Sequence, residues 1–250
     1  MRTVVSAGLD ELADSLASEL AGVLAARQAE GGIPCVVLTG GTGGAASLAA
    51  LAGLARSGAG AEDARGEKGA DAASVDWSRV RFIWGDERWL PAGDPERNDR
   101  LADETLFAAA EVDPALVHRV AASDAGVSLD AAAADYARIV ASIERIDVAI
   151  NGVGPDGHIA SLFPGRDELR IAGTDAPSAV AVRDSPKPPP ERVSLTLPAL
   201  NRADRVWLIA AGAGKRDAVR DIVERRPSPA GSVHGGQETV LWTDEAALGA

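Results

Sequence analysis

Apolar residues near the start of the chain repeat with the period of a helix, and a shorter run of a different kind follows them. The helical spacing extends from Leu9 to Leu24, and Gly31-Gly32 ends it. The apolar run Cys35–Thr39 is too short for a helix and predicts a buried strand. It leads into a glycine-rich segment, 40–44, and then into an alanine-rich helix that ends near Ser57.

Short apolar runs and helical patterns keep alternating along the rest of the chain. The predicted strands are 80–84, 147–151, 179–183, 192–196, 206–210 and 238–242, and the predicted helices are 98–110, 128–144 and 215–225. This alternation indicates an α/β fold, with a mainly parallel, Rossmann-like sheet covered by helices on both faces. Ligands of such sheets bind at the carboxyl ends of the strands, so we expect the loops that follow the strands to meet at one edge.

The length and local composition of the chain predict its domain organisation. Its 250 residues fit one large α/β domain, which we expect to span 1–250. Residues 58–75 are small, polar and charged, and they have no apolar periodicity. We expect them to form a mobile surface insertion.

The net charge and composition of the chain argue against some classes of function. The net charge of −12 repels nucleic acid and anionic membranes, so an anionic substrate would need a local cluster of basic groups. No apolar run approaches the ~18 residues of a membrane span, and the N-terminus lacks the apolar run of a signal peptide, so we expect a cytoplasmic protein. The sequence does not settle the oligomeric state, and a monomer is the default expectation. The single cysteine, Cys35, lies in a predicted strand and is expected to be a buried apolar residue. Among the 25 basic residues, only Lys68, Lys187 and Lys215 are lysine.

Two of the strand-following loops have groups suited to an anion. Backbone N–H groups of Thr39-Gly40-Gly41-Thr42-Gly43-Gly44 can approach an anion at a helix N-terminus, although an ordinary tight turn would have the same sequence. In Gly85-Asp86-Glu87-Arg88, the planar guanidinium of Arg88 can bind a phosphate or carboxylate. The two acids beside it could orient this arginine or other groups of the site. The alternative for this second loop is a solvated charge cluster at the end of a strand.

The loop Gly152–His158 combines glycines, Asp156 and a histidine. Histidine titrates near neutral pH, so His158 is suited to act as a general base that activates water. The loop matches G-x-G-x-x-G, but Pro155 and the helix-breaking Phe163-Pro164-Gly165 argue against a dinucleotide site. The other histidines, His118 and His234, are expected to have no role, and no spacing of His or Cys predicts a metal.

Two of the three lysines fall in candidate site loops. Lys187 lies in the stiff segment Ser185-Pro186-Lys187-Pro188-Pro189, which can direct a charge with little loss of entropy. Lys215 follows Gly212-Ala213-Gly214 at the start of a predicted helix, where a cation opposes the helix dipole. This unfavourable placement suggests an anion nearby, although simple exposure would also explain it.

Together these segments resemble the 6-phosphogluconolactonase family, within the glucosamine-6-phosphate isomerase/deaminase superfamily. The matching stretches span nearly the whole chain in the family's order, and they are Leu38–Thr42, Phe82–Pro91 with Asp94 and Asn98, Asn151–Gly165, Lys187–Thr196 and Gly212–Lys215. The most specific is the twelve-residue run Gly154–Gly165. The resemblance implies a three-layer α/β/α sandwich. The chain departs from the family in the first loop, which reads Gly-Gly-Thr-Gly where the family usually has Gly-Gly-Ser-Thr-Pro.

The resemblance also implies a reaction and the residues for it. The expected reaction is hydrolysis of a sugar-phosphate lactone, 6-phospho-D-glucono-1,5-lactone, without metal, cofactor or covalent intermediate. His158 would activate water, and Arg88 and Lys215, with backbone donors near Gly41 and Thr42, would hold phosphate and hydroxyl groups. The remaining residues would line or support the pocket, and they are Gly40, Asp86, Asn98, Asp156, Lys187 and Arg192.

Three other functions are disfavoured. A glucosamine-6-phosphate deaminase needs an extra acid after the Asp-Gly-His loop, and here no carboxylate follows until Asp167. A sugar-phosphate-binding regulator usually carries a separate DNA-binding segment, and this acidic chain has no basic extension of that kind. An acyl-enzyme hydrolase would need a G-x-S-x-G elbow, which is missing, so Ser161 is expected to be structural.

Overall fold

The protein is built on a six-stranded parallel sheet. In the computed structural model, which describes residues 1–58 and 75–249, the strand order is β1-β9-β8-β5-β2-β3. The strands are β1 (Arg2–Ser6), β2 (Cys35–Leu38), β3 (Arg81–Trp84), β5 (Ile146–Gly152), β8 (Ala203–Ala210) and β9 (Glu238–Asp244). Every neighbouring pair in this sheet is parallel, which confirms the predicted α/β class.

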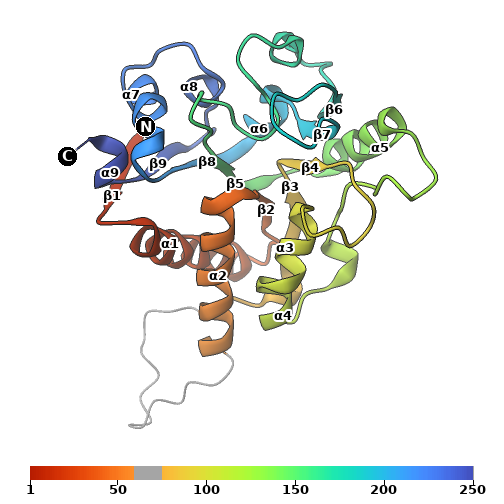
Figure 1. The fold of residues 1–250 in the computed structure, drawn as a ribbon. Coiled ribbons are helices and arrows are strands. Elements are labelled where there is room, and N and C mark those ends of the chain that lie inside the picture. The colour runs from red at the N-terminus through yellow and green to blue at the C-terminus, as the bar shows by residue number, and fades with distance from the viewer. Residues whose placement is uncertain (59–74, 250) are drawn as a thin grey trace.

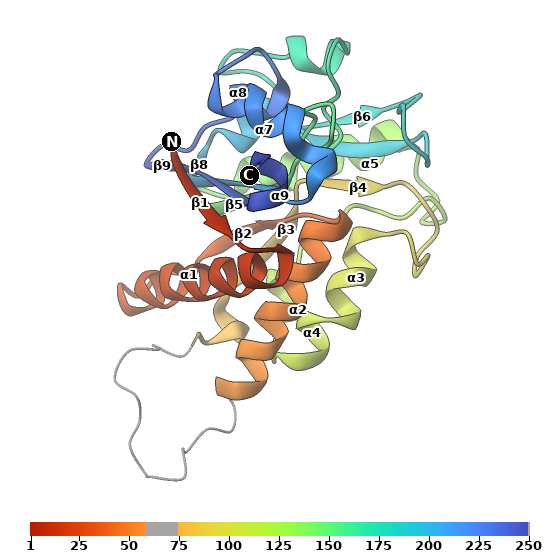
Figure 2. The ribbon, with the colours of Figure 1, turned by 60° about the vertical axis from the view of Figure 1, so that its left-hand side comes forward.

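Helices cover both faces of the sheet, so that the molecule has three layers (Figures 1 and 2). One face is covered by α1 (Leu9–Ala29), α2 (Gly41–Gly58), α3 (Asn98–Glu104) and α4 (Leu106–Ala109). The other face is covered by α5 (Leu129–Ser142), α6 (Leu197–Leu200), α7 (Arg216–Val223), α8 (Pro229–Ser232) and α9 (Glu245–Leu248). No helix in the two described segments is both long and apolar enough to span a bilayer.

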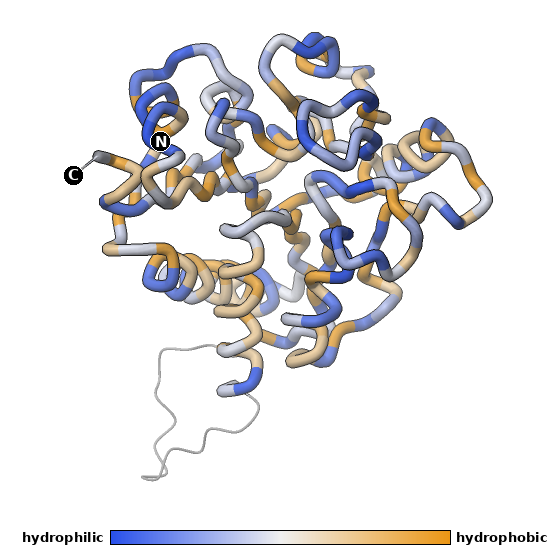
Figure 3. Tube along the Cα trace, viewed as in Figure 1, coloured by the Kyte–Doolittle hydropathy of each residue, from blue (hydrophilic) through white to orange (hydrophobic). Residues whose placement is uncertain are grey.

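Alternation along the strands gives each face its own hydrophobic core. Val36 and Leu38 of β2 pack with the leucines of α1 and α2, whereas Cys35 and Val37 face α5. Cys35 is fully buried, as predicted, and burial raises the pKa of its thiol to about 12. Hydrophilic residues gather on the outer loops of the trace (Figure 3). A sheet buried on both faces explains why its strands appear as continuous apolar runs in the sequence.

A second, three-stranded antiparallel sheet lies beside the carboxyl ends of the main sheet. It consists of β4 (Asp86–Arg88), β7 (Arg192–Leu195) and β6 (Ala179–Val182), in that order. The prediction placed β4 in a loop, because three consecutive charged residues have low strand propensity. Pairing with β7, which is distant in sequence, extends it instead. This small sheet places Asp86 and Arg88 opposite the loop between β6 and β7.

Two other local predictions were wrong. Strand β1 was not predicted, because it is a half-exposed edge strand with few apolar residues whose pairing partner β9 is at the other end of the chain. The predicted helix 98–110 is divided into α3 and α4, since Thr105 has non-helical dihedral angles of φ −115° and ψ −90°. Most of the predicted insertion, 58–75, lies outside the described residues.

Candidate active site

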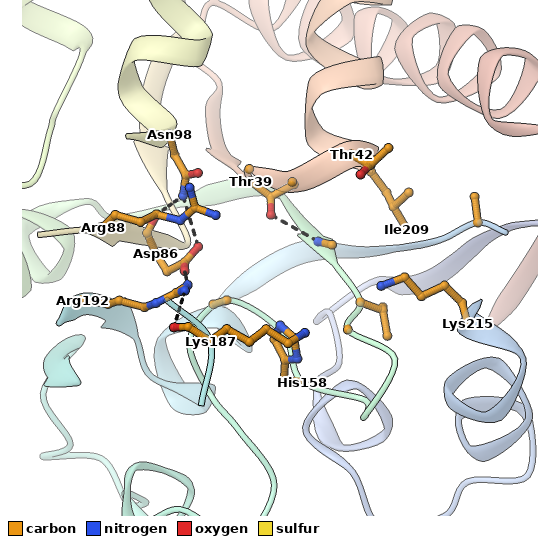
Figure 4. Close-up of a pocket in the computed structure, with 18 of the residues that line it drawn as sticks. Thr39, Thr42, Asp86, Arg88, Asn98, His158, Lys187, Arg192, Ile209 and Lys215 are labelled. Atoms are coloured by element: carbon orange, nitrogen blue, oxygen red, sulfur yellow. Dashed lines mark hydrogen bonds and ion pairs between the residues drawn. The ribbon is translucent and has the colours of Figure 1, made fainter. Parts of the chain in front are cut away.

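A cavity of about 390 Å³ opens at the carboxyl ends of the parallel strands (Figure 4). The strand order reverses direction between β2 and β5, and the cavity is lined by residues that follow both of these strands. Such a switch point is where ligands bind in open α/β sheets. Its polar lining comprises Thr39, Gly40, Gly41, Thr42, Asp86, Arg88, Asn98, His158, Lys187, Arg192 and Lys215.

The glycine-rich segment forms the start of helix α2. The helix begins at Gly41, so the free N–H groups of its first turn lie at the cavity wall. Thr39 Oγ1 accepts a hydrogen bond from Gly152 N at 3.2 Å, which ties this segment to the end of β5. Gly40 is required by packing, because a Cβ there would lie 1.9 Å from Asn98 Oδ1. The N-terminal end of an 18-residue helix therefore faces the cavity, an arrangement that favours an anion.

The loop after β5 folds back on itself and presents His158 to the cavity. Gly154 N donates to His158 O at 2.8 Å, and Gly157 N donates to Gly154 O at 3.0 Å. The imidazole ring packs against Phe163, with 4.6 Å between the ring centroids. Turns rather than a helix follow this loop, so the G-x-G-x-x-G pattern does not open a dinucleotide site here.

Asp156 and His158 form a hydrogen-bonded pair. Nδ1 of His158 lies 2.5 Å from Oδ1 of Asp156, which leaves the other ring nitrogen, Nε2, free of this contact. Burial and the charge of Lys187 lower the pKa of His158, against the opposing effect of Asp156. Burial favours the neutral acid of Asp156, but the hydrogen bond and charge of His158 outweigh it and lower the pKa of that carboxyl. The lowered pKa favours the neutral imidazole, which is the form that can accept a proton.

Asp86 is buried in the cavity wall within a hydrogen-bond network. Its Oδ2 accepts from Ser161 Oγ at 2.6 Å and lies 3.6 Å from Nη1 of Arg192. Asn98 Nδ2 donates to the backbone oxygen of Asp86 at 2.8 Å. Ser161, which the sequence predicted to be structural, is 1% exposed and connects the His158 loop to β4.

Of the four basic residues that line the cavity, Arg192 supports a loop, and the other three are Arg88, Lys187 and Lys215. Arg192 is buried and braces the loop between β6 and β7, donating to the carbonyl oxygens of Pro189 at 3.1 Å and Pro188 at 2.9 Å. Arg88 donates through Nη1 to the carbonyl of Glu96, while its Nε has no hydrogen-bond partner among the described residues. The side chains of Lys187 and Lys215 extend toward one another across the cavity (Figure 4). Burial and the charge of Lys187 lower the pKa of Lys215, as expected for two cations that converge.

The structure brings the predicted site residues together. Ten of the eleven line the cavity, and Asp156 lies behind His158 as its hydrogen-bond partner. His118 and His234 are not among the lining residues. Apolar residues that complete the wall, Leu9, Val153 and Ile209, were not predicted, since nothing distinguishes them in sequence from core residues. Over residues 1–58 and 75–249, no group of three or more His, Cys, Asp or Glu side chains is arranged to hold a metal ion.

Known proteins are similar to this chain in both sequence and fold. Residues 7–242 match the family described as glucosamine-6-phosphate isomerases/6-phosphogluconolactonase. The chain is 40% identical to a 6-phosphogluconolactonase of Streptomyces coelicolor, over 98% of this chain and 92% of the relative. It is 42% identical to a 6-phosphogluconolactonase of Mycobacterium tuberculosis, over 69% of this chain and 73% of the relative.

Solved structures extend the comparison to three dimensions. The crystal structure of 6-phosphogluconolactonase from Thermotoga maritima superposes with a TM-score of 0.77 at 27% identity, covering 97% of this chain and 98% of that one. A monomeric glucosamine-6-phosphate deaminase gives a TM-score of 0.80 at 19% identity, covering 100% of this chain and 99% of that one, a likeness of fold alone. The chain belongs to the glucosamine-6-phosphate isomerase/6-phosphogluconolactonase family.

Proposed function

We propose that this protein hydrolyses 6-phospho-D-glucono-1,5-lactone to 6-phospho-D-gluconate, in the oxidative branch of the pentose phosphate pathway. His158 acts as the general base, without a metal or a covalent intermediate. The observation that carries the proposal is the placement of His158: its Nδ1 is held by Asp156, and its ring lines a cavity shared with Arg88, Lys187 and Lys215. The full-length relatives that bear the name 6-phosphogluconolactonase support the choice of substrate.

The reaction needs a proton acceptor and two sites for negative charge, one for the oxyanion that forms at the carbonyl and one for the phosphate. His158 Nε2 accepts a proton from water as the water oxygen bonds to the lactone carbonyl carbon. The bond from this carbon to the ring oxygen then breaks, and the proton passes from His158 to that oxygen. A positioned base contributes about 10²–10⁴-fold, and cationic groups beside the carbonyl stabilise the developing oxyanion. Lys187, whose charge acts on His158, is suited to that second task.

The phosphate is assigned to Arg88, Lys215 and the N-terminus of α2. The guanidinium of Arg88 lines the cavity, Lys215 extends into it, and the N-terminus of α2 contributes backbone N–H groups at Gly41 and Thr42. Asp86, Asn98 and Arg192 hold the walls through the hydrogen bonds described above.

The same lining disfavours the deaminase reaction, which requires proton transfer at carbon. Among the described residues that line the cavity, Asp86 is the only carboxylate, and Ser161 and Arg192 already occupy one of its oxygens. The segment after His158 adds no acid before Asp167, and β4 carries Arg88 where deaminases usually have tyrosine.

The proposal is tested by the rate of loss of freshly generated 6-phosphogluconolactone, corrected for spontaneous hydrolysis. We expect strong acceleration by the wild type and a loss of about 10²–10⁴-fold in kcat for His158→Ala. Acceleration that survives in the variant would assign the base to another residue. No acceleration by the wild type would reject the lactonase, and glucosamine 6-phosphate would be the next substrate to test.

A further inference from the structure

Glu87 lies between two cavity residues but faces away from the cavity. Successive side chains of a strand point to opposite sides, so Asp86 and Arg88 face the cavity and Glu87 enters the protein behind the wall. Glu87 is 1% exposed. An acid buried this deeply is stable only where hydrogen-bond donors surround it.

The donors are backbone N–H groups of the residues that form the cavity wall. Oε1 of Glu87 accepts from Arg88 N at 2.7 Å and from Asn98 N at 2.8 Å, and Oε2 accepts from Asp99 N at 2.8 Å. The N-cap residue of α3, Arg97, makes no side-chain capping bond. Glu87 therefore caps α3 from a different element, and in doing so it joins β4 to the start of this helix.

Arg97 closes the same cluster from the other side. It is 2% exposed, its Nη2 lies 3.9 Å from Oε2 of Glu87, and it forms a two-bond pair with Asp99 at 2.9 and 2.8 Å. Nη1 of Arg97 also donates to the backbone oxygen of Arg88 at 3.3 Å. Both the N–H and the C=O of Arg88 are thus held by buried side chains, those of Glu87 and Arg97.

We propose that Glu87 is a positioning residue that sets the placement of Arg88 and Asn98 in the substrate cavity. It fixes the backbone of Arg88, whose guanidinium binds phosphate, and that of Asn98, whose amide holds Asp86 and contacts Gly40. The assignment rests on the proposed function for the identity of the ligand. Burial of this acid behind the wall serves the geometry of the site, beyond its contribution to the stability of α3.

The test compares Glu87→Gln with Asp147→Asn. Asp147 is also 1% exposed and accepts a backbone N–H, from Cys35 at 2.8 Å, but it lies at the amino end of β5, away from the cavity. The substituted glutamine keeps the size of the side chain but has one acceptor oxygen for three donors. We expect Glu87→Gln to lower kcat/KM for 6-phosphogluconolactone by about ten- to a hundredfold and to weaken binding of inorganic phosphate. Asp147→Asn should lose thermal stability and keep both properties.

A double-mutant cycle identifies the residue through which Glu87 acts. If it acts through Arg88, Glu87→Gln should cost little more in the background of Arg88→Ala, so that the two effects are strongly non-additive. Asn98→Ala is the second background, and losses that are additive in both backgrounds, or wild-type phosphate affinity in Glu87→Gln, would overturn the assignment. Should Glu87→Gln fail to fold, Glu87→Asp decides by the same measurements, since it keeps the charge and is too short to reach both Asn98 and Asp99.

Binding of inorganic phosphate tests the role of Glu87 independently of the proposed lactonase activity. If the wild type did not hydrolyse the lactone, binding of inorganic phosphate to the wild type, Glu87→Gln and Asp147→Asn would still measure whether Glu87 sets the anion site.

Discussion

Gly154 packs against the imidazole of His158 so closely that there is no room for a Cβ at position 154. A Cβ at position 154 would lie 1.9 Å from Nδ1 of His158 and 2.6 Å from Oδ1 of Asp156. The backbone of the same glycine also receives and donates hydrogen bonds within the loop, from Gly157 N and to His158 O. The glycine in this motif thus sets the position of the proposed base.

Replacing this glycine should therefore remove activity with little change in the rest of the fold. In Gly154→Ala, the methyl group must push His158 and Asp156 out of place, and a displacement of ~1 Å can cost about 10²-fold in kcat. The control is Gly22→Ala in α1, where an added Cβ has no atom within 4 Å. That variant should be fully active and more stable by about 0.5–1 kcal/mol. Normal kcat in Gly154→Ala would mean that His158 is not the base.

The pH dependence should show a requirement for neutral His158. Burial is the main reason that the pKa of His158 lies below the usual 6.5. The neutral form predominates at any pH above this pKa, so activity should fall as the pH decreases through it. Glu87, whose pKa burial raises to about 7, titrates in a neighbouring range. The acid limb of kcat/KM alone does not separate the two groups, and a profile that is flat from pH 5 to 8 would exclude both.

Two substitutions with opposite effects assign that limb. Asp156 raises the pKa of His158 and Lys187 lowers it. Asp156→Asn should therefore move the acid limb to lower pH, and Lys187→Met should move it to higher pH. The main causes of the shift of Glu87 are its burial and the charges of Asp99 and Arg97, so a limb due to Glu87 should stay in place in both variants. The measurement is kcat/KM against pH for the three proteins.

Much of the site could be predicted because its residues follow strands in short, contiguous motifs. Asp156 and His158 are two positions apart, and Lys187 and Lys215 stand out in an arginine-rich chain. The sequence also predicted the sheet that brings these loops to one edge, since strands buried on both faces are continuous apolar runs.

What could not be predicted depends on partners far apart in the chain. Arg192 lines the pocket as expected, but its hydrogen bonds to the carbonyl oxygens of the loop between β6 and β7 could not be predicted. From the sequence, Glu87 could either orient the neighbouring Arg88 or belong to a solvated charge cluster, and the sequence did not decide between the two. The only signal for its buried role was that Arg97, before the helix at Asn98, is a poor N-cap residue. Strand β4 was missed for the same reason, because β7 supplies its hydrogen bonds.

Removal of metal ions should leave the rate unchanged. In the described part of the chain, His158 and Asp86 are the only histidine and carboxylate that line the cavity, and the cations beside them repel a divalent ion. We expect the same kcat/KM before and after dialysis against EDTA, measured on one preparation with a sample to which Mg²⁺ and Zn²⁺ are returned. A large loss that a divalent ion restores would contradict the proposed metal-independent mechanism.

Lys215 should govern the preference for a phosphorylated substrate. Its side chain extends into the cavity, whereas the neighbouring Arg216 is exposed and donates to the carbonyl oxygen of Ala246. Both Lys215→Met and Arg216→Met remove one positive charge, so general electrostatic attraction changes equally in the two variants. Loss of a charged hydrogen bond to phosphate should lower kcat/KM for 6-phosphogluconolactone by about tenfold or more in Lys215→Met alone. Hydrolysis of unphosphorylated gluconolactone should change little in either protein. Equal losses on both lactones would instead place Lys215 at the reacting carbonyl. Equal losses in the two variants would mean that Lys215 acts only through long-range electrostatic attraction.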